Sequence, residues 1–513
     1  MQTDIALILN KVSALLDRQG YQSYAVGGLI RDWFLGNETN DLDIVVNGNA
    51  IDIANKVAKA MKGKFVLLDD VNRIARVVVS EGEQIWYVDL SSFSDGVESD
   101  LTRRDFTINA MAAELKQFVN VVSRRPRQNE EIMKQSGMKL IDPFSGEKDL
   151  KNGIIRGVSE KIFEVDAVRM LRAVRLADEL NFAIDPKTEA LIRCHSHLVS
   201  KVPGERIREE LLKIVNLSNT AHYLYYLDEL SLLLALIPEL AESKGVEQPK
   251  LHFWDVFDHS LQTVAAIEFL IREHDWEYGS EEILADAPWL DRVKEHLDEE
   301  VSSGSTHRTL LKLSGLFHDV AKPRTKFVDN DDSAHFYGHA KEGADMTAAI
   351  LGRLRFSNRE ISLVESLVYH HLRPMQMSSE GMPTQRAIYR YFRDVGDAGI
   401  DILILALADY LASRGPLLDM KEWKGHCRLI NYILTERERQ QAKILPAKLV
   451  DGHDLINSFS LTPGPLIGEL LDLVQEAQAG GELTTKEEAL ALVGRKLSLR
   501  TQRSNIPKQR SVN

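Results

Sequence analysis

The spacing of apolar residues changes at about residue 166, and this change limits the folds that the 513-residue chain can adopt. Before that point, short runs of alternating apolar and polar residues lie between clusters of Gly, Asn and Asp, a pattern typical of β-strands. The runs are residues 42–46, 65–69, 73–79 and 86–93. Beyond it, nearly every window repeats at the 3.6-residue period of a helix, with breaks at prolines. We therefore expect an α+β fold, with a small mixed sheet followed by an all-helical remainder.

Composition favours a cytoplasmic enzyme. Hydrophobic residues make up 44% and charged residues 27% of the chain, as in soluble globular proteins. No apolar run approaches the roughly 20 residues that span a membrane, and the N-terminal residues have helical spacing without the features of a secretion signal. The two cysteines, Cys194 and Cys427, are too far apart in sequence to indicate a disulfide framework or a zinc motif.

Charge gives less information about partners. The net charge of −13 argues against a protein that coats nucleic acid over its whole surface. Basic runs at residues 124–127 and 495–510 are usually solvated surface, and only their context can make them RNA contacts. Residues 122–139 are polar and aperiodic, and we expect them to form an exposed, inserted loop.

A pair of acids on the first of these strands indicates a metal site. Because strand side chains alternate, Asp41 and Asp43 point to one face, and the apolar residues between and after them point to the other. Two adjacent carboxylates repel each other unless a cation lies between them, and Mg²⁺ binds such oxygens together with substrate phosphates. Asp89, on another expected strand, is a candidate third member of this cluster.

A double glycine precedes this pair. Gly27 and Gly28 lead into a short helix that ends at Gly36, so backbone N–H groups at its start can hold phosphates. Arg31, within the helix, adds a guanidinium that can bind the same phosphates. Glycines, a cation and paired acids together predict a nucleotide site.

Residues 27–46 resemble the head motif of the class II template-independent RNA nucleotidyltransferases, the tRNA CCA-adding enzymes and bacterial poly(A) polymerases. The similarity continues in the order of the family. It covers the second head motif, the element that closes the head, the base-selecting helix, the motif that follows it and part of the tail, at residues 100–112, 142–156, 166–182, 205–214 and 453–471.

The resemblance implies a reaction. Two Mg²⁺ ions at Asp41 and Asp43, with Asp89 as a third catalytic acid, would activate the 3′-hydroxyl of an RNA and neutralise the attacked α-phosphate of CTP or ATP, with the tRNA acceptor end as partner. The nucleotide-binding residues that it implies are Gly27, Gly28, Arg31, Arg104, Asp105, Asn109, Asp166, Arg169, Arg172 and Arg175.

Base choice follows from hydrogen-bonding chemistry. Asp166 and Arg169 are three residues apart, which would place them on one helix face, with Arg172 three further on. A carboxylate only accepts and a guanidinium only donates, so the pair complements cytosine and adenine, which offer an amino donor beside ring acceptors. Uracil and guanine would leave buried groups unpaired, at about 1–3 kcal/mol each.

Two positions depart from the family pattern. Val165 stands where the family usually has an acid, with Glu164 beside it. The segment between the strand of Asp89 and residue 100, where full CCA-adding enzymes carry a longer flexible loop, is reduced to residues 92–99. Such a short segment resembles that of the members that add only C residues or only the terminal A.

A second set of residues lies in the helical part. The pattern resembles the HD-domain metal phosphohydrolases, and His259, His318, Asp319 and Asp409 match their four-ligand set. His339, His370 and His371 would allow a second ion. Nitrogen and carboxylate ligands in this mixture suit a transition metal such as Mn²⁺ or Ni²⁺. The pattern predicts a phosphodiesterase or phosphatase, whose substrates in similar two-headed enzymes are RNA-end phosphates or cyclic phosphates.

We therefore expect four regions: a nucleotidyltransferase head (1–150), a neck and body for nucleotide selection and RNA binding (151–245), an HD phosphohydrolase domain (246–420) and a helical RNA-binding tail (421–513). The function expected is a tRNA 3′-end nucleotidyltransferase that adds CCA, CC or A. A poly(A) polymerase shares the same head. A third possibility is an HD phosphohydrolase whose head only binds nucleotides.

Overall fold

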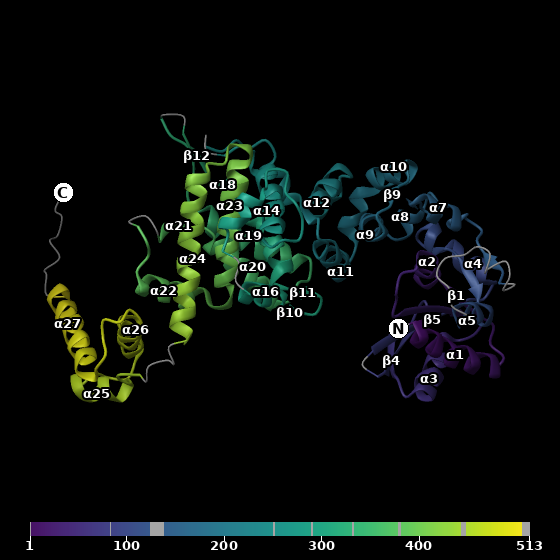
Figure 1. Cartoon of the computed structure of the whole chain (residues 1–513), viewed down its shortest axis with the longest axis horizontal. Coiled ribbons are helices and arrows are strands. Elements are labelled where there is room, and N and C mark those ends of the chain that lie inside the picture. Colours follow the sequence, from purple (N-terminus) through teal and green to yellow (C-terminus); the bar gives the residue numbers. More distant parts are fainter. Residues whose placement is uncertain are drawn as a thin grey trace, which may run out of the picture. The chain divides into compact units, whose positions relative to one another are not determined.

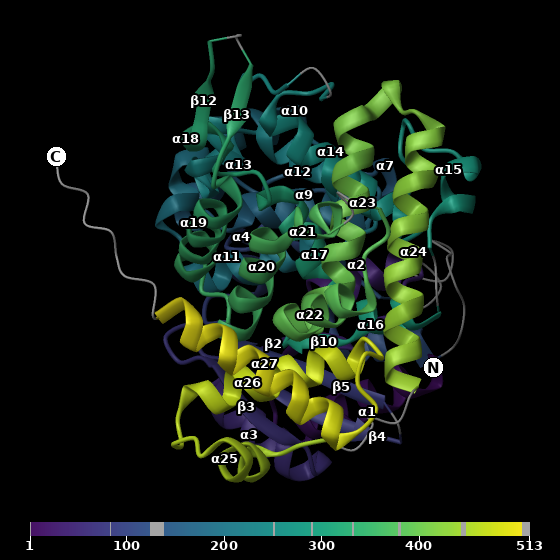
Figure 2. The same ribbon diagram turned by 90° about the vertical axis from the view of Figure 1, so that its left-hand side faces the viewer.

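The chain forms two compact units in the computed structural model, which describes residues 2–82, 84–123, 138–249, 252–288, 291–330, 333–377, 381–442 and 448–504. The first unit comprises Met1–Glu210 and Tyr226–Leu236, and the second comprises Leu211–Tyr225 and Ile237–Asn513. Figures 1 and 2 show a sheet in the first unit and helices through the second. The α+β class expected from the sequence is confirmed. The division into four regions stays a prediction.

A seven-stranded mixed sheet is the framework of the first unit (Figure 1). Its strand order is β3-β4-β5-β2-β1-β6-β7, in which β2 and β5 pair in parallel and all other neighbours are antiparallel. The strands are β1 (Ser23–Val26), β2 (Asp41–Val46), β3 (Lys64–Asp69), β4 (Ile74–Glu81), β5 (Gln84–Ser92), β6 (Ala112–Glu114) and β7 (Leu140–Ile141).

The four strands expected from alternating residues are all present, as β2, β3, β4 and β5. The other three, β1, β6 and β7, have four, three and two residues. Runs as short as these carry no period-2 signal, and they are strands because β2 and its neighbours supply hydrogen-bonding partners.

Helices complete the head. They are α1 (Gln2–Arg18), α2 (Gly28–Leu35), α3 (Ala50–Met61), α4 (Val97–Thr102), α5 (Leu115–Ser123) and α7 (Gly146–Asn152). α3 packs on β4 and β5, while α5 packs on β1 and on α1. Helix α2 ends at Gly36, as expected, where φ is 72°. The expected loop at 122–139 starts inside α5, and residues 124–137, with the basic run 124–127, lie outside the described residues.

A short helical segment follows the head. It contains α8 (Ile162–Val165), α9 (Arg169–Glu179), α10 (Pro186–His195), α11 (Gly204–Val215), α12 (Thr220–Glu229) and α13 (Leu232–Leu236). Two-residue strands β8 (Ile154–Ile155) and β9 (Ala183–Ile184) pair in parallel beside α9. Helix α10 starts at Pro186, where the Asp185 carboxylate accepts the N–H groups of residues 187 and 188, so the predicted break is a capped helix start.

The second unit is mainly helical. Its helices are α14 (Val256–Leu270), α15 (Glu281–Asp286), α16 (Asp291–Asp298), α17 (His307–Phe317), α18 (Lys322–Thr325), α19 (His339–Arg353), α20 (Asn358–His370), α21 (Arg373–Gln376), α22 (Gln385–Val395), α23 (Gly399–Arg414), α24 (Met420–Ala442), α25 (Gly452–Phe459), α26 (Pro465–Ala479) and α27 (Lys486–Ser504). Two hairpins join them, β10 (Glu300–Ser302) with β11 (Ser305–Thr306), and β12 (Lys326–Val328) with β13 (Ala334–Phe336).

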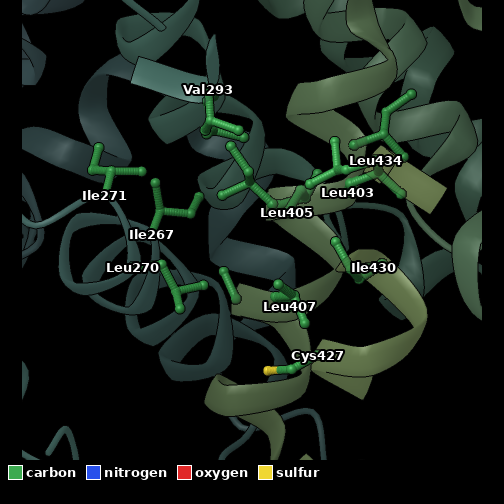
Figure 3. Close-up of a cluster of buried hydrophobic side chains, with 14 of the residues drawn as sticks. Ile267, Leu270, Ile271, Val293, Leu403, Leu405, Leu407, Cys427, Ile430 and Leu434 are labelled. Atoms are coloured by element: carbon green, nitrogen blue, oxygen red, sulfur yellow. The ribbon is translucent and has the colours of Figure 1, made fainter. Parts of the chain in front are cut away.

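The core of this unit lies around α23. Figure 3 shows Leu403, Leu405 and Leu407 of this helix among side chains of α14 and α24. α23 is buried for most of its length and packs against α14, α17, α20 and α24. Its apolar residues occur all round the helix, which is the pattern of a central helix.

Helices α25, α26 and α27 pack on one another and form a separate small core (Figure 2). Glu476 of α26 is 92% buried and accepts from three arginines of α22, Arg386, Arg390 and Arg393, at 2.6–3.2 Å. Cys194 is exposed and Cys427 is buried, and both are free thiols.

Candidate functional site

The paired acids of β2 lie where alternation placed them. Leu42, Ile44 and Val46 are buried, whereas Asp41 is exposed and Asp43 is partly exposed. Because β2 and β5 are parallel and in register, Asp43 lies directly opposite Asp89. The sheet therefore brings the three predicted acids to one place.

The carboxylate of Asp89 is already paired. Arg76, opposite it on β4, donates from Nε and Nη2 at 2.7 and 2.8 Å. The expectation that Asp89 completes the acid cluster thus holds for its position on the strand, while its charge is compensated by an arginine that the sequence analysis missed. The sequence feature that could have identified Arg76 is its position among apolar residues on an expected strand.

The surroundings of Asp43 disfavour its ionised form. Burial, together with the negative charges of Asp89 and Asp41, raises its pKa to about 6, although the positive charge of Arg104 opposes this shift. The N–H of Gly28 donates to Asp43 Oδ2 at 3.2 Å. A bound cation would relieve the remaining cost, so these residues fit the divalent ion that the head implies.

Gly27 is required beside this acid. Its φ is +66°, in the left-handed region, and a Cβ at this position would lie 2.7 Å from Arg104 Nη1 and 2.8 Å from Asp43 Oδ2. The double glycine therefore allows the backbone to approach the acid and the arginine closely.

A chain of hydrogen bonds connects several predicted nucleotide contacts. Arg31 Nη1 donates to Asn109 Oδ1 at 2.9 Å, and Asn109 Nδ2 donates to Asp105 Oδ1 at 3.2 Å. Arg172 Nη1 donates to Asp105 Oδ2 at 3.0 Å. Burial alone would raise the pKa of Asp105, but the Arg172 guanidinium and these bonds hold it below the ordinary value. The network fixes Arg31 and Arg172 in one orientation.

The expected helix face containing Asp166 and Arg169 is wrong. Helix α8 ends at Val165, Asp166 is extended with φ −155° and ψ 100°, and α9 begins at Arg169. A residue with these backbone angles is not helical, so Asp166 and Arg169 do not lie on one helix face, although their side chains remain neighbours.

Asp166 is instead held by Arg206 of α11, whose Nη1 and Nη2 donate to its two oxygens at 3.0 and 2.8 Å. Arg169 Nε is 3.8 Å from Asp166 Oδ2, and its other nitrogens donate to the carbonyls of Arg103 and Arg104. Arg206 lies in the motif at 205–214 but is not among the nucleotide-binding residues predicted from the sequence.

Three further positions named from the sequence have these surroundings. Arg175 donates to Glu210 at 2.7 Å and to Glu179 at 2.5 Å, so its charge is compensated within the protein. Val165 is 74% exposed. Glu164, considered as a substitute for the acid that the family has there, lies 3.8 Å from His195.

The second predicted site is assembled in the second unit. His259 of α14, His318 after α17 and Asp409 of α23 place ligand atoms together: His259 Nε2 is 3.2 Å from His318 Nε2 and 3.1 Å from Asp409 Oδ1. Asp319 Oδ2 is 3.1 Å from His318 Nε2. Three of these four residues are fully buried, and Asp409 is 22% exposed.

A second group adjoins the first and shares Asp319. His339 and His371 have Nε2 atoms 3.4 Å apart, and Asp319 Oδ1 is 3.4 Å from the first and 3.9 Å from the second. His370 is not part of it; its ring packs edge-on against Tyr369. The α20 helix turns adjacent residues about 100° apart, so only one of the two histidines can face the site.

Electrostatics support cation binding at this centre. Burial alone would lower the pKa of His318, but the Asp319 and Asp409 carboxylates raise it to about 10. Burial and the neighbouring His318 lower the pKa of His371 to about 4, which keeps it neutral and able to bind a metal. Among the described residues, neither oxygen of Asp319 takes a hydrogen bond of normal geometry, although Lys322 Nζ is 2.5 Å from Oδ2.

A cavity of about 590 Å³ opens beside the second group. His339 lines it together with Tyr337, Tyr369 and Arg373. Tyr337 is 72% exposed and Tyr369 is 48% exposed, so two aromatic rings lie at the surface next to a candidate metal ligand. In the described part of the chain, none of the helices combines the length and apolar character needed to span a bilayer.

Family comparisons cover both sites. Residues 23–156 match the Poly A polymerase head domain and residues 256–414 match the HD domain. Residues 181–244 match the family described as "Probable RNA and SrmB- binding site of polymerase A", and residues 435–493 match "tRNA nucleotidyltransferase domain 2 putative".

Similar proteins extend over nearly the whole chain. The A-adding tRNA nucleotidyltransferase of Deinococcus radiodurans is 30% identical over 92% of this chain and 94% of its own length. The CC-adding tRNA nucleotidyltransferase of Thermus thermophilus is 28% identical over 92% and 93%. The structure of a CCA-adding enzyme with CTP matches with a TM-score of 0.61 over 96% of this chain and 95% of that one, and at 23% identity it shows the fold. The chain therefore belongs to the class II tRNA nucleotidyltransferases, the family of the CCA-, CC- and A-adding enzymes.

Proposed function

We propose that this protein adds one kind of nucleotide, either C residues or the terminal A, to the 3′ end of tRNA. The connection between β5 and α4 carries the proposal: β5 ends at Ser92 and α4 begins at Val97, which leaves Phe93 to Gly96. A link this short between two packed elements has little freedom to rearrange for a second nucleotide. Relatives that match more than nine tenths of the chain are A-adding and CC-adding enzymes.

The head residues supply binding and orientation. Asp41 and Asp43 would hold the divalent ion, and the N-terminal end of α2 with Arg31 would receive the triphosphate. A bound Mg²⁺ supplies positive charge that activates the 3′-hydroxyl and neutralises the α-phosphate. Arg172, fixed by Asp105, would orient the nucleotide, because a rigid guanidinium presents its donors in one geometry.

Base choice would rest on Asp166 and Arg169. Arg206 occupies one lone pair on each Asp166 oxygen, and a carboxylate has about four such sites, so acceptors are left for the amino group of C or A. Arg169, 16% exposed, is held beside Asp166 by the carbonyls that it binds. The selecting pair is thus positioned by a third residue.

We also infer that the HD centre hydrolyses phosphate esters at RNA ends. His259, His318, Asp319 and Asp409 would hold one ion, with His339 and His371 available to a second. An ion such as Mn²⁺ or Ni²⁺, when bound, supplies Lewis acidity for attack on phosphorus. Lys322 lies against Asp319, so its ammonium is placed to bind a phosphate oxygen, and Tyr337 and Tyr369 offer surfaces on which bases can stack.

The deciding experiment sizes the products of nucleotide addition. Purified protein and Mg²⁺ are incubated with tRNA transcripts that end before the tail, after C and after CC, with CTP and ATP singly and together. We expect addition of C residues only, or of one A to the CC-ended tRNA only. Addition of C, C and A by one enzyme would refute single-nucleotide addition, and long A tracts would identify a poly(A) polymerase. No addition, with phosphate release intact, would leave the HD centre as the active site.

Gly27→Ala tests the close approach at the head. The new methyl group must displace Arg104 or Asp43, and a displacement of about 1 Å can cost about 10²-fold in rate, so we expect kcat/KM for addition to fall by roughly that factor. Gly20→Ala is the matched control, because Gly20 also has a positive φ of 76° but has no atom within 4 Å of an added Cβ. Equal losses in the two variants would attribute the effect to backbone strain.

Asp166→Ala tests base recognition. Without Asp166 the amino group of a bound base would lose its acceptor, at about 1–3 kcal/mol, so discrimination of the correct nucleotide from UTP should fall about 5- to 150-fold. The measurement is kcat/KM for each of the four nucleotides, with Arg206→Ala and the exposed Arg193→Ala alongside. A uniform loss for all four nucleotides would show that Asp166 acts only as a structural partner of Arg206.

Replacement of His318 and Asp319 by Ala and Asn separates the two centres. Phosphate release from RNA with 3′-phosphate or 2′,3′-cyclic ends should fall below detection, because two ligands are lost, while nucleotide addition continues. The exposed His222→Ala variant is the control for removing a histidine from the same unit. Loss of both activities together would contradict two independent sites.

A further inference from the structure

A third group of histidines and an acid lies in the second unit, outside the HD centre. Its members are His296 of α16, His307 at the start of α17 and Asp401 in the first turn of α23. His296 Nε2 is 2.8 Å and His307 Nδ1 is 2.9 Å from the same oxygen, Asp401 Oδ2. Three different elements therefore each place one side-chain atom that could bind a metal ion in the same small region.

All three side chains are buried. Asp401 is fully buried, and the two histidines are 6–8% exposed. The second carboxylate oxygen, Asp401 Oδ1, is buried and has no hydrogen-bond partner among the described residues. A buried carboxylate with one oxygen unsatisfied is costly unless a cation or a further donor completes it.

Two imidazoles and one carboxylate are the ligand set that a borderline ion prefers. Zn²⁺ accepts nitrogen and oxygen ligands in a tetrahedral arrangement, in which bonds of about 2 Å place the ligand atoms about 3.3 Å apart. The two imidazole nitrogens, now 2.8 and 2.9 Å from Asp401 Oδ2, would move outward by a few tenths of an ångström to admit the ion. A hard ion such as Mg²⁺ prefers a shell of oxygen ligands, whereas two of the three side chains here offer nitrogen. The chemistry favours zinc.

An entry path is present. A cavity of about 220 Å³ is lined by His296, Glu299 and Arg437, so one ligand borders a space that water can occupy. That space offers the fourth ligand and the route by which the ion enters. Asp397 also lines this cavity but is not part of the ligand group, which makes it a useful control.

We propose that His296, His307 and Asp401 bind one structural Zn²⁺ ion. The position of this site in the fold indicates which elements the ion would stabilise. His307 and His318 mark the two ends of α17, eleven residues or roughly 16 Å apart at 1.5 Å per residue. Asp401 and Asp409 lie on α23, eight residues or roughly 12 Å apart. An ion at the first end of both helices fixes the two elements that present HD ligands further along.

The test measures zinc in the full-length protein after equilibration with Zn²⁺ and gel filtration. We expect Asp401→Asn, which keeps the shape of the side chain, to lose one equivalent relative to the unmodified chain and to lower the melting temperature in Zn²⁺. Asp397→Asn should keep the full zinc content. Equal zinc content in the two variants would refute the site.

A second measurement does not depend on any variant folding. Crystals of the unmodified chain grown with Zn²⁺ are measured on both sides of the zinc absorption edge. An anomalous peak between His296, His307 and Asp401 supports the proposal. Absence of that peak, in crystals where the HD ligands show one, overturns it and leaves the group as a hydrogen-bonded link between helices.

Discussion

The parallel pairing of β2 with β5 is the constraint on which the head depends. Parallel strands require a crossover, and α3, β3 and β4 form it. The register sets Asp43 opposite Asp89, and a slip of one residue would turn the acids of β2 into the core. Gly27 can approach Asp43 only because β1 and β2 are also in register. The candidate metal-binding acids and the glycines are therefore positioned by one sheet geometry.

Both candidate centres bring several charged side chains close together, and the two centres compensate these charges differently. In the head, Arg76 forms an ion pair with Asp89, and the positive charge of Arg104 lies close to Asp43. Two arginines therefore compensate the negative charge of these acids. In the HD centre the fixed cation is Lys322, and the remaining partners are histidines. Imidazoles can give up their protons to make room for an ion, whereas guanidinium groups cannot. The HD centre is thus better suited to a tightly held transition metal, and the head to an ion that arrives with a nucleotide.

Sequence reasoning succeeded where periodicity and motif coincide. Alternation located β2 and β5, and the resemblance to HD-domain enzymes identified His259, His318, Asp319 and Asp409, which converge in the structure. It failed where tertiary contacts decide. Asp166 lies outside the helix, and its carboxylate binds Arg206, which is 40 residues away in the sequence. His371 belongs to the candidate metal group and His370 does not, because only one of two consecutive helical residues faces a given side. The His296 group had no sequence signal, since three unrelated elements supply one residue each.

Nucleotide choice can change within one enzyme only if a recognition element can move. In this chain, Asp166 is held through both oxygens by Arg206, and Arg169 is held by two backbone carbonyls. The β5–α4 connection has only four residues, from Phe93 to Gly96, between packed elements. A carboxylate fixed in this way presents its remaining acceptors in a single direction, so it suits one base geometry and not two in succession. The rigidity of Asp166 and Arg169 and the shortness of this connection therefore both support the proposed addition of one kind of nucleotide.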